Sequence, residues 1–211
     1  MIASDNAFLE TAFNVFNRIY FENSLPKAMI TIQSSRKSYG YITINKVWKA
    51  KKDSYHEINI SAEYLSRPVE NVMATLVHEM VHLYAMVKGI ADTSNGGRYH
   101  NKNFKRLAEE RDLIIEHDKY IDFSITSPSK RFIEGLRENG LITEIDHCRI
   151  DGMNNNPPTA TGGNNGNLGG TEKKKSSTRK YVCEGCGITV RATKDVNIIC
   201  GDCMSAMVKV D

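Results

Sequence analysis

Two histidines and a glutamate with the spacing H-E-x-x-H are the strongest chemical signal in this sequence. His78 and His82 are four positions apart, so on a helix they lie one above the other on a single face. Two neutral imidazoles can then bind one ion, and Glu79 lies close enough to take a proton from water activated there. Zinc-assisted peptide hydrolysis needs these groups. The pattern therefore predicts zinc ligands at His78 and His82, with Glu79 as the catalytic base.

The plainer alternative is a pair of hydrogen-bonded histidines on a partly polar helix face. Apolar residues flank the motif on both sides, from Ala74 to Leu83, so we expect this helix to be largely buried. Burial of two histidines and a glutamate without a partner would be strongly unfavourable. A bound metal is therefore the preferred interpretation.

A catalytic zinc also needs a third protein ligand and one open position. The metzincin pattern would require Gly at position 85 and His at position 88, where this chain has Ala85 and Lys88. His100 is the preferred third ligand, because it follows a Gly-Gly turn and opens a predicted helix that could fold back over the first pair. Three carboxylates remain as alternatives: Glu109, Glu110 and Asp92.

Four of the five cysteines form two C-x-x-C pairs near the C-terminus. These are Cys183, Cys186, Cys200 and Cys203. In each pair the chain doubles back so that both sulfurs can face one tetrahedral ion, with Gly187 and Gly201 relaxing the turns. This predicts a structural zinc held by four thiolates, which supplies folding energy to a module with little core. Cys148 has no such partner and is expected to be a free thiol in a reducing compartment.

Hydrophobic periodicity places these motifs on an α+β set of elements. The expected helices are 4–22, 67–88, 101–112 and 129–138, and the expected strands are 29–33, 39–45 and 56–60. Ser66 is expected to cap the second helix, with Pro68 in its first turn, and Gly89 to close it.

Composition indicates an ordinary globular chain. It has 211 residues, of which 40% are hydrophobic and 25% are charged. No stretch approaches the roughly 18 apolar residues of a membrane helix, and the N-terminus lacks a basic secretory signal. We therefore expect a cytoplasmic protein with no membrane partner, associated with the nucleoid if it binds DNA. The Gly- and Asn-rich stretch 152–178 predicts a flexible linker between a domain at 1–151 and a module at 179–211.

The net charge of +3 is concentrated toward the C-terminus. A short basic run beside a zinc module can neutralise phosphates, although it can equally be the solvated end of a linker. The candidate nucleic-acid contacts are Lys173, Lys174, Lys175, Arg179, Lys180, Arg191 and Lys194. Tyr181 is the only aromatic residue of the tail that could stack on a base.

The segments HEMVHLY at 78–84 and YHNKNFKRL at 99–107 together resemble the SprT-like metalloprotease domain, a family that includes the spartan proteases. Members carry a downstream histidine followed three or four residues later by Phe, as His100 and Phe104 are here. The resemblance covers about residues 6–120, and SprT-like proteins often carry a C-terminal zinc ribbon.

This resemblance implies an α+β, zincin-like metalloprotease domain followed by a small four-cysteine zinc ribbon. It assigns His78, His82 and His100 to a catalytic zinc and Glu79 to the role of base, with a second, structural zinc in the ribbon. The implied activity is that of a zinc metalloendopeptidase acting on DNA-associated or DNA-crosslinked proteins, with single-stranded or junction DNA as a partner.

Two other functions remain open from the sequence. The first is a non-enzymatic nucleic-acid-binding protein in which both zincs are structural, and the second is a protease whose ribbon recognises a protein. The residue that would stabilise the oxyanion is also open among Tyr41, Tyr84, Tyr99 and Tyr120. The remaining histidines have no partner at ligand spacing and are expected to be surface or hydrogen-bonded residues: His56, His117 and His147.

Overall fold

The computed structural model describes residues 2–118, 122–143, 145, 147–150 and 179–210. The chain divides into two compact units, Met1–Asn165 and Gly166–Asp211. The linker predicted at 152–178 lies outside the described residues, so its boundaries with the domains at 1–151 and 179–211 stay a prediction. No helix in the described part of the chain has the length and apolar character needed to cross a membrane.

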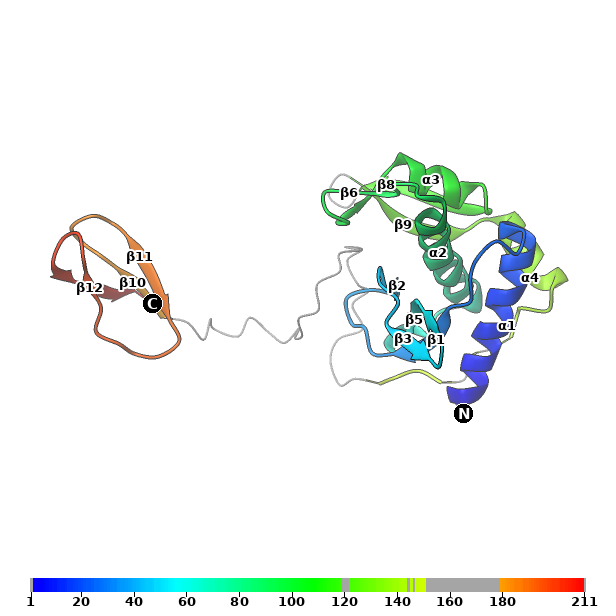
Figure 1. The fold of residues 1–211 in the computed structure, drawn as a ribbon, viewed down its shortest axis with the longest axis horizontal. Coiled ribbons are helices and arrows are strands. Elements are labelled where there is room, and N and C mark those ends of the chain that lie inside the picture. Colours follow the sequence, from blue (N-terminus) through cyan, green and yellow to red (C-terminus); the bar gives the residue numbers. More distant parts are fainter. Residues whose placement is uncertain (1, 119–121, 144, 146, 151–178, 211) are drawn as a thin grey trace. The chain divides into compact units, whose positions relative to one another are not determined.

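The first unit mixes helices with small sheets (Figure 1), which confirms the α+β expectation, while the zincin architecture stays a prediction. Its helices are α1 Ile2–Phe21, α2 Val69–Lys88, α3 Lys102–Glu109 and α4 Lys130–Glu138, with a short 3-10 helix at Ala62–Tyr64. Its strands are β1 Met29–Gln33, β2 Gly40–Ile42, β3 Trp48–Ala50, β4 Asp53–Tyr55, β5 Glu57–Ser61, β6 Thr93–Ser94, β7 Tyr99–His100, β8 Leu113–Asp118 and β9 Asp122–Pro128.

Helix α1 buries an apolar stripe with helical spacing, formed by Leu9, Phe13 and Phe16. The Asn17 side chain then holds the turn that follows the helix: its Oδ1 accepts a hydrogen bond from Leu25 N at 3.1 Å, and its Nδ2 donates to Leu25 O at 3.2 Å. This clamp directs the chain from α1 into the sheet.

Helix α2 is buried along most of its length, as the flanking apolar residues predicted. Gly89 closes it as expected, with φ 64 and its N–H directed to the Met86 carbonyl at 3.2 Å. The predicted Ser66 cap is wrong. The helix begins at Val69 with Pro68 at the N-cap, and the Pro68 carbonyl accepts the first helical hydrogen bonds.

A three-stranded sheet of order β1-β5-β2 packs beside α2. Strand β1 runs parallel to β5, and β2 runs antiparallel to it. Ile30, Ile58 and Ile60 are buried in the core, so one face of the sheet is apolar. The strand predicted at 39–45 is shorter than expected, and β2 leaves its outer edge unpaired by any strand of the described residues.

Three antiparallel strand pairs of the first unit were not predicted from the sequence: β3–β4, β6–β7 and β8–β9. The helix predicted to reach residue 112 ends at Glu109, because Asp112 adopts a left-handed conformation with φ 60 and turns the chain into β8. Along β8, Leu113 and Ile115 are buried while Ile114 is exposed, which is the alternation of a strand with one buried face.

The second unit is a small β module. Strands β10 Arg179–Val182, β11 Thr189–Ala192 and β14 Val208–Val210 form an antiparallel sheet of order β11-β10-β14, and β12 Ile199–Cys200 pairs with β13 Ser205–Ala206. Its buried cluster contains only Tyr181, Cys183, Cys200 and Met207 among the described residues. So small a core fits the expectation that a metal ion supplies much of the folding energy.

Candidate metal centres

Three histidines from two elements converge in the first unit. His78 and His82 project from α2 with ring centroids 5.0 Å apart, and His100 on β7 lies 4.9 Å from each of them. The Nε2 atoms of His82 and His100 are 3.0 Å apart. One ring nitrogen from each of the three histidines lies within 4.8 Å of the other two. Two nitrogens bound to one tetrahedral zinc would be separated by roughly 3.3 Å, so this spacing fits the ion.

Short local contacts bring His100 to the helix. Strand β7 pairs with β6, which places His100 opposite Thr93. The next residue, Asn101, caps α3 by accepting hydrogen bonds from the N–H groups of Asn103 and Phe104. Phe104 is fully buried beneath the cluster, and its ring centroid lies 4.2 to 4.7 Å from those of the three imidazoles. The family resemblance singled out Phe104, and the structure shows its physical role as the apolar floor of the site.

The other ring nitrogen of each histidine has its own partner. Nδ1 of His82 donates to the Asp92 carboxylate at 2.6 Å. Nδ1 of His78 lies 2.8 Å from the Thr126 hydroxyl, and Nδ1 of His100 lies 2.9 Å from the Ser124 hydroxyl. These partners fix each ring so that Nε2 faces the centre of the cluster, which is how proteins usually orient metal-binding histidines.

Burial keeps two of the three imidazoles, those of His78 and His100, in the neutral form. It lowers the pKa of His78 well below its usual value, with His100 and His82 acting in the same direction, and it lowers the pKa of His100 to about 3, aided by His82. A neutral imidazole has a free lone pair for a metal, so both the protonation state and the ring geometry fit a zinc site.

Of the alternative ligands, Asp92 lies at the outer nitrogen of His82 and therefore supports a ligand ring. Glu109 and Glu110 instead lie on the surface of α3, where they pair with Lys105 at 3.6 Å and Arg106 at 2.7 Å. Among these candidates, His100 alone joins the cluster of His78 and His82.

Glu79 is buried next to this cluster. Its pKa is raised to about 7 because burial disfavours the carboxylate, although His82 acts in the opposite direction. Among the described residues no side chain or backbone group forms a hydrogen bond with it, so its oxygens are not committed to a structural role. Strand β2 passes close by: a Cβ on Gly40 would lie 3.4 Å from Glu79 Cγ.

The tyrosine candidates differ in their surroundings. The Tyr41 hydroxyl donates to Glu57 at 3.1 Å, and Tyr84 hydrogen-bonds Arg111. Tyr99 lies on β7 directly before His100, and Tyr120 lies outside the described residues. Tyr99 is therefore the described tyrosine nearest in sequence to His100.

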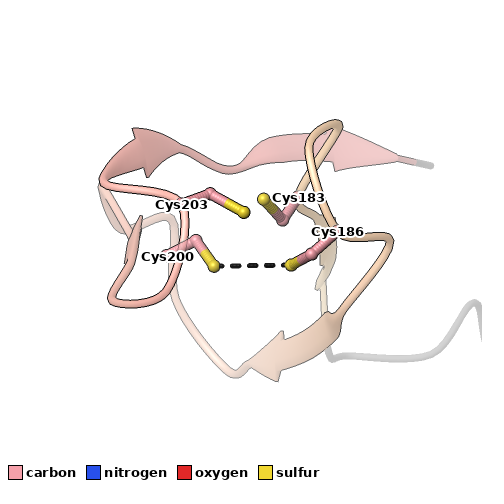
Figure 2. A group of neighbouring side chains, drawn as sticks. All are labelled: Cys183, Cys186, Cys200 and Cys203. Atoms are coloured by element: carbon pink, nitrogen blue, oxygen red, sulfur yellow. Dashed lines mark hydrogen bonds between the residues drawn. The ribbon is translucent and has the colours of Figure 1, made fainter.

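Four cysteines converge in the second unit (Figure 2). One sulfur from each lies within 4.8 Å of the others, and the Sγ atoms of Cys186 and Cys200 are 3.6 Å apart. The Ser205 hydroxyl lowers the pKa of the Cys183 thiol to about 6, while the neighbouring thiols Cys186 and Cys183 raise the pKa of Cys203 to about 12. Four crowded thiols resist joint ionisation unless a cation lies among them, so the cluster fits a tetrathiolate metal site.

Glycines shape the cysteine turns. Gly187 has φ 73, a left-handed backbone conformation that glycine adopts without strain. The motif spacing did not single out Gly185, but a side chain at this position would crowd the cluster, because a Cβ there would lie 3.1 Å from Cys203 Sγ. Gly201 does not adopt a positive φ. Cys148 is exposed and outside this cluster, as expected for a free thiol.

Four of the predicted nucleic-acid contacts lie among the described residues. Arg179 donates to Asp195 at 2.9 Å, so its charge is already paired. Lys180 and Arg191 are exposed cross-strand neighbours on β10 and β11, and Lys194 is exposed. The structure does not describe Lys173, Lys174 and Lys175.

The remaining histidines have ordinary partners. His56 Nδ1 contacts the Thr43 carbonyl at 2.9 Å, His117 lies 3.4 Å from Asp122, and His147 lies 2.8 Å from Asp5. None of them joins the histidine cluster.

The first unit thus belongs to the class of proteins with a candidate metal centre formed by three histidines. Two of the histidines and a buried glutamate come from one helix, and the third histidine comes from a neighbouring strand. The SprT-like family model matches residues 9–118, just over half of the chain, and the chain belongs to the SprT-like family. The match spans the three histidines and Glu79 but ends before β9 and the cysteine module. No curated protein and no solved structure gives a match.

Proposed function

We propose that this chain is a zinc-dependent endopeptidase of the H-E-x-x-H type that acts on DNA-associated or DNA-crosslinked proteins. The observation that carries the proposal is the convergence of three imidazoles next to a buried, uncommitted carboxylate. Membership of the SprT-like family supports the same activity.

His78, His82 and His100 would hold the catalytic zinc through their inward nitrogens. When bound, zinc supplies a Lewis acid and makes water a better nucleophile near neutral pH. Asp92, Ser124 and Thr126 keep the rings oriented, and the Phe104 floor excludes water from beneath them.

Glu79 provides the proton-transfer step. Its carboxylate takes a proton from the attacking water and then delivers that proton to the amine of the departing peptide. The absence of a hydrogen-bonded partner among the described residues leaves its oxygens available for both transfers.

Strand β2 offers a way to present a protein substrate. It is the edge strand of the sheet, and Gly40 brings its backbone close to Glu79. An extended peptide can pair with such an edge through main-chain hydrogen bonds, which gives affinity with little sequence preference. We infer that the substrate segment lies along β2 as an added strand.

The cysteine module would hold the second, structural zinc through Cys183, Cys186, Cys200 and Cys203. With a linker at 152–178, the module at 179–211 would act as a tethered recognition unit. Lys180 and Arg191 are its best-placed contacts for a nucleic-acid backbone, because both are exposed and neither forms an ion pair among the described residues.

The test compares purified wild type with Glu79→Gln on a DNA-binding protein substrate, with and without single-stranded DNA. We expect cleavage by the wild type only, stimulated by DNA, and unchanged zinc content in the variant. Equal cleavage by Glu79→Gln would reject the mechanism. Absence of cleavage by the zinc-loaded wild type in every condition would favour the non-enzymatic nucleic-acid-binding alternative, and DNA-independent cleavage would favour a ribbon that recognises protein.

A further inference from the structure

The β3–β4 hairpin is an exposed, basic part of the first unit. Residues 44–54 are all exposed, and this stretch carries four lysines against one acidic residue, Asp53. The lysines are Lys46, Lys49, Lys51 and Lys52. None of them forms an ion pair with another described residue, so the hairpin presents an unneutralised positive surface.

Trp48 gives this surface an aromatic platform. Its side chain is 40% exposed, although its Nε1 donates to Glu57 Oε2 at 2.6 Å. Glu57 is itself fixed by hydrogen bonds from Thr31, Gln33 and Tyr41. The indole is therefore held in one orientation by its polar edge while a large part of the ring remains in contact with solvent.

A hollow of about 360 Å³ lies beside this platform. Its lining carries two positive charges, from Lys27 and Lys46, against one negative charge from Asp53, and Tyr55 and His56 contribute rings. Tyr55 is the direct cross-strand neighbour of Trp48, so the aromatic platform and the hollow belong to adjacent positions of the same hairpin.

We propose that the β3–β4 hairpin binds single-stranded nucleic acid, with a base stacked on Trp48 and the neighbouring phosphates bound by its lysines. Aromatic platforms combined with a basic track are the usual means of binding single strands without sequence preference. Nucleic acid is also a partner in the proposed function. Binding at the hairpin, however, requires no peptidase activity and no contribution from the cysteine module.

Two other anionic partners fit these features less well. An anionic membrane surface would attract the lysines, but the hydrogen bond to Glu57 holds the indole against the sheet and prevents it from swinging into lipid. An acidic peptide would satisfy the lysines, yet it would leave the exposed ring and its hollow without a flat partner.

Trp48 is the only tryptophan in the chain, so its fluorescence reports directly on this site. The first experiment titrates the full zinc-loaded chain, carrying Lys180→Glu and Arg191→Glu to weaken ribbon contacts, with oligothymidylate and with oligouridylate. We expect saturable quenching, and the two oligomers distinguish DNA from RNA as the source of the strand. Absence of quenching by both would overturn the proposal.

A pair of charge-matched variants tests the lysines while keeping the fluorophore. In the same background, Lys49→Glu with Lys52→Glu should weaken binding at least tenfold and flatten its salt dependence, by about 0.7 in logarithmic slope for each phosphate that the hairpin no longer neutralises. Lys102→Glu with Lys130→Glu makes the same change in net charge at exposed sites elsewhere and should leave binding within twofold. Equal weakening by both pairs would overturn the assignment to the hairpin.

The membrane alternative is tested with vesicles of equal parts phosphatidylglycerol and phosphatidylcholine. A blue shift of Trp48 emission with these vesicles, without quenching by either oligomer, would replace the proposal with a lipid-binding one. Glu79→Gln separates the two proposals: it should keep full quenching while losing cleavage. If the wild type also fails to cleave but is quenched, the proposed function fails and this inference stands.

Discussion

Asp92 accepts a hydrogen bond from Nδ1 of His82 at 2.6 Å, and the Nε2 atom of the same ring faces His100 at 3.0 Å. The carboxylate thus fixes the tautomer that leaves Nε2 unprotonated, and it makes that nitrogen a stronger donor to a cation. The sequence left Asp92 open as a candidate ligand, and its position behind His82 gives it an orienting role.

Replacement of Asp92 by Ala should lower zinc affinity at the histidine site by about 10- to 100-fold, because His82 loses its fixed tautomer. The measurement is competition with a chromogenic chelator, scored per site. Glu109→Ala is the matched control, since Glu109 pairs with Lys105 on the surface of α3. Comparable losses in the two variants would contradict the role assigned to Asp92.

Gly40→Ala should destabilise the first unit by about 1–3 kcal/mol through overpacking. A Cβ at Gly40 would lie 2.9 Å from both Asn59 O on β5 and Thr75 Cγ2 on α2, so β2 must shift relative to β5 and the Thr75 side chain must also give way. Denaturant unfolding measures the change. Gly135→Ala is the control, because a Cβ there meets only Tyr20 Oη at 3.9 Å, and alanine favours the α4 helix. Stability unaffected by Gly40→Ala would mean that this approach is not tight in solution.

Glu63 should stabilise the folded first unit in a pH-dependent way. Partial burial opposes its ionisation, yet hydrogen bonds from Ser34, Ser35 and Ser61 outweigh it and lower the pKa. A lowered folded-state pKa means that the stabilisation is present above the unfolded value of 4.5 and is lost as the pH falls through the folded value.

Glu63→Gln should therefore cost about 1 kcal/mol at neutral pH and progressively less in acid. Urea unfolding over a pH series measures this difference, with Glu134→Gln on the exposed face of α4 as the control. A cost that stays constant down to strongly acidic pH would show that the charge of Glu63 contributes nothing.

Cys200→Ser should remove one equivalent of zinc and unfold the second unit, because its small core depends on the four-sulfur cluster. Metal analysis should fall from two zinc ions per chain to one, while the histidine site keeps its metal. Cys148→Ser should retain both, since Cys148 lies outside the cluster. Retention of two zinc ions by Cys200→Ser would exclude the tetrathiolate assignment.

Local patterns predicted the parts of the fold that depend on nearby residues. The end of α2 at Gly89 follows from a helical stripe and a left-handed cap, and both are encoded within one turn. The spacing of His78 and His82 likewise fixes their common face. The grouping of the four cysteines needed only the two C-x-x-C pairs.

The rest depends on contacts between distant segments. Ser124 and Thr126 alternate along β9, a pattern compatible with any strand, and only the fold brings them to His100 and His78. The β3–β4 hairpin could not be predicted because its lysine-rich sequence lacks the alternation of a half-buried strand, and its turn places Lys51 at φ 50 where glycine or asparagine is usual. The Trp48 bond to Glu57, nine residues away, anchors it instead.

Strand β9 supports the histidine cluster through Ser124 and Thr126, so the cluster depends on residues beyond the family match. A chain cut at residue 118, where the family match ends, would retain all three imidazoles, Glu79 and Asp92. It would nevertheless lose the hydroxyl partners of two of those imidazoles, together with the strand that pairs with β8. The smallest piece of this protein able to hold its metal in the proposed geometry therefore extends at least to Pro128, about ten residues beyond the region that identifies the family.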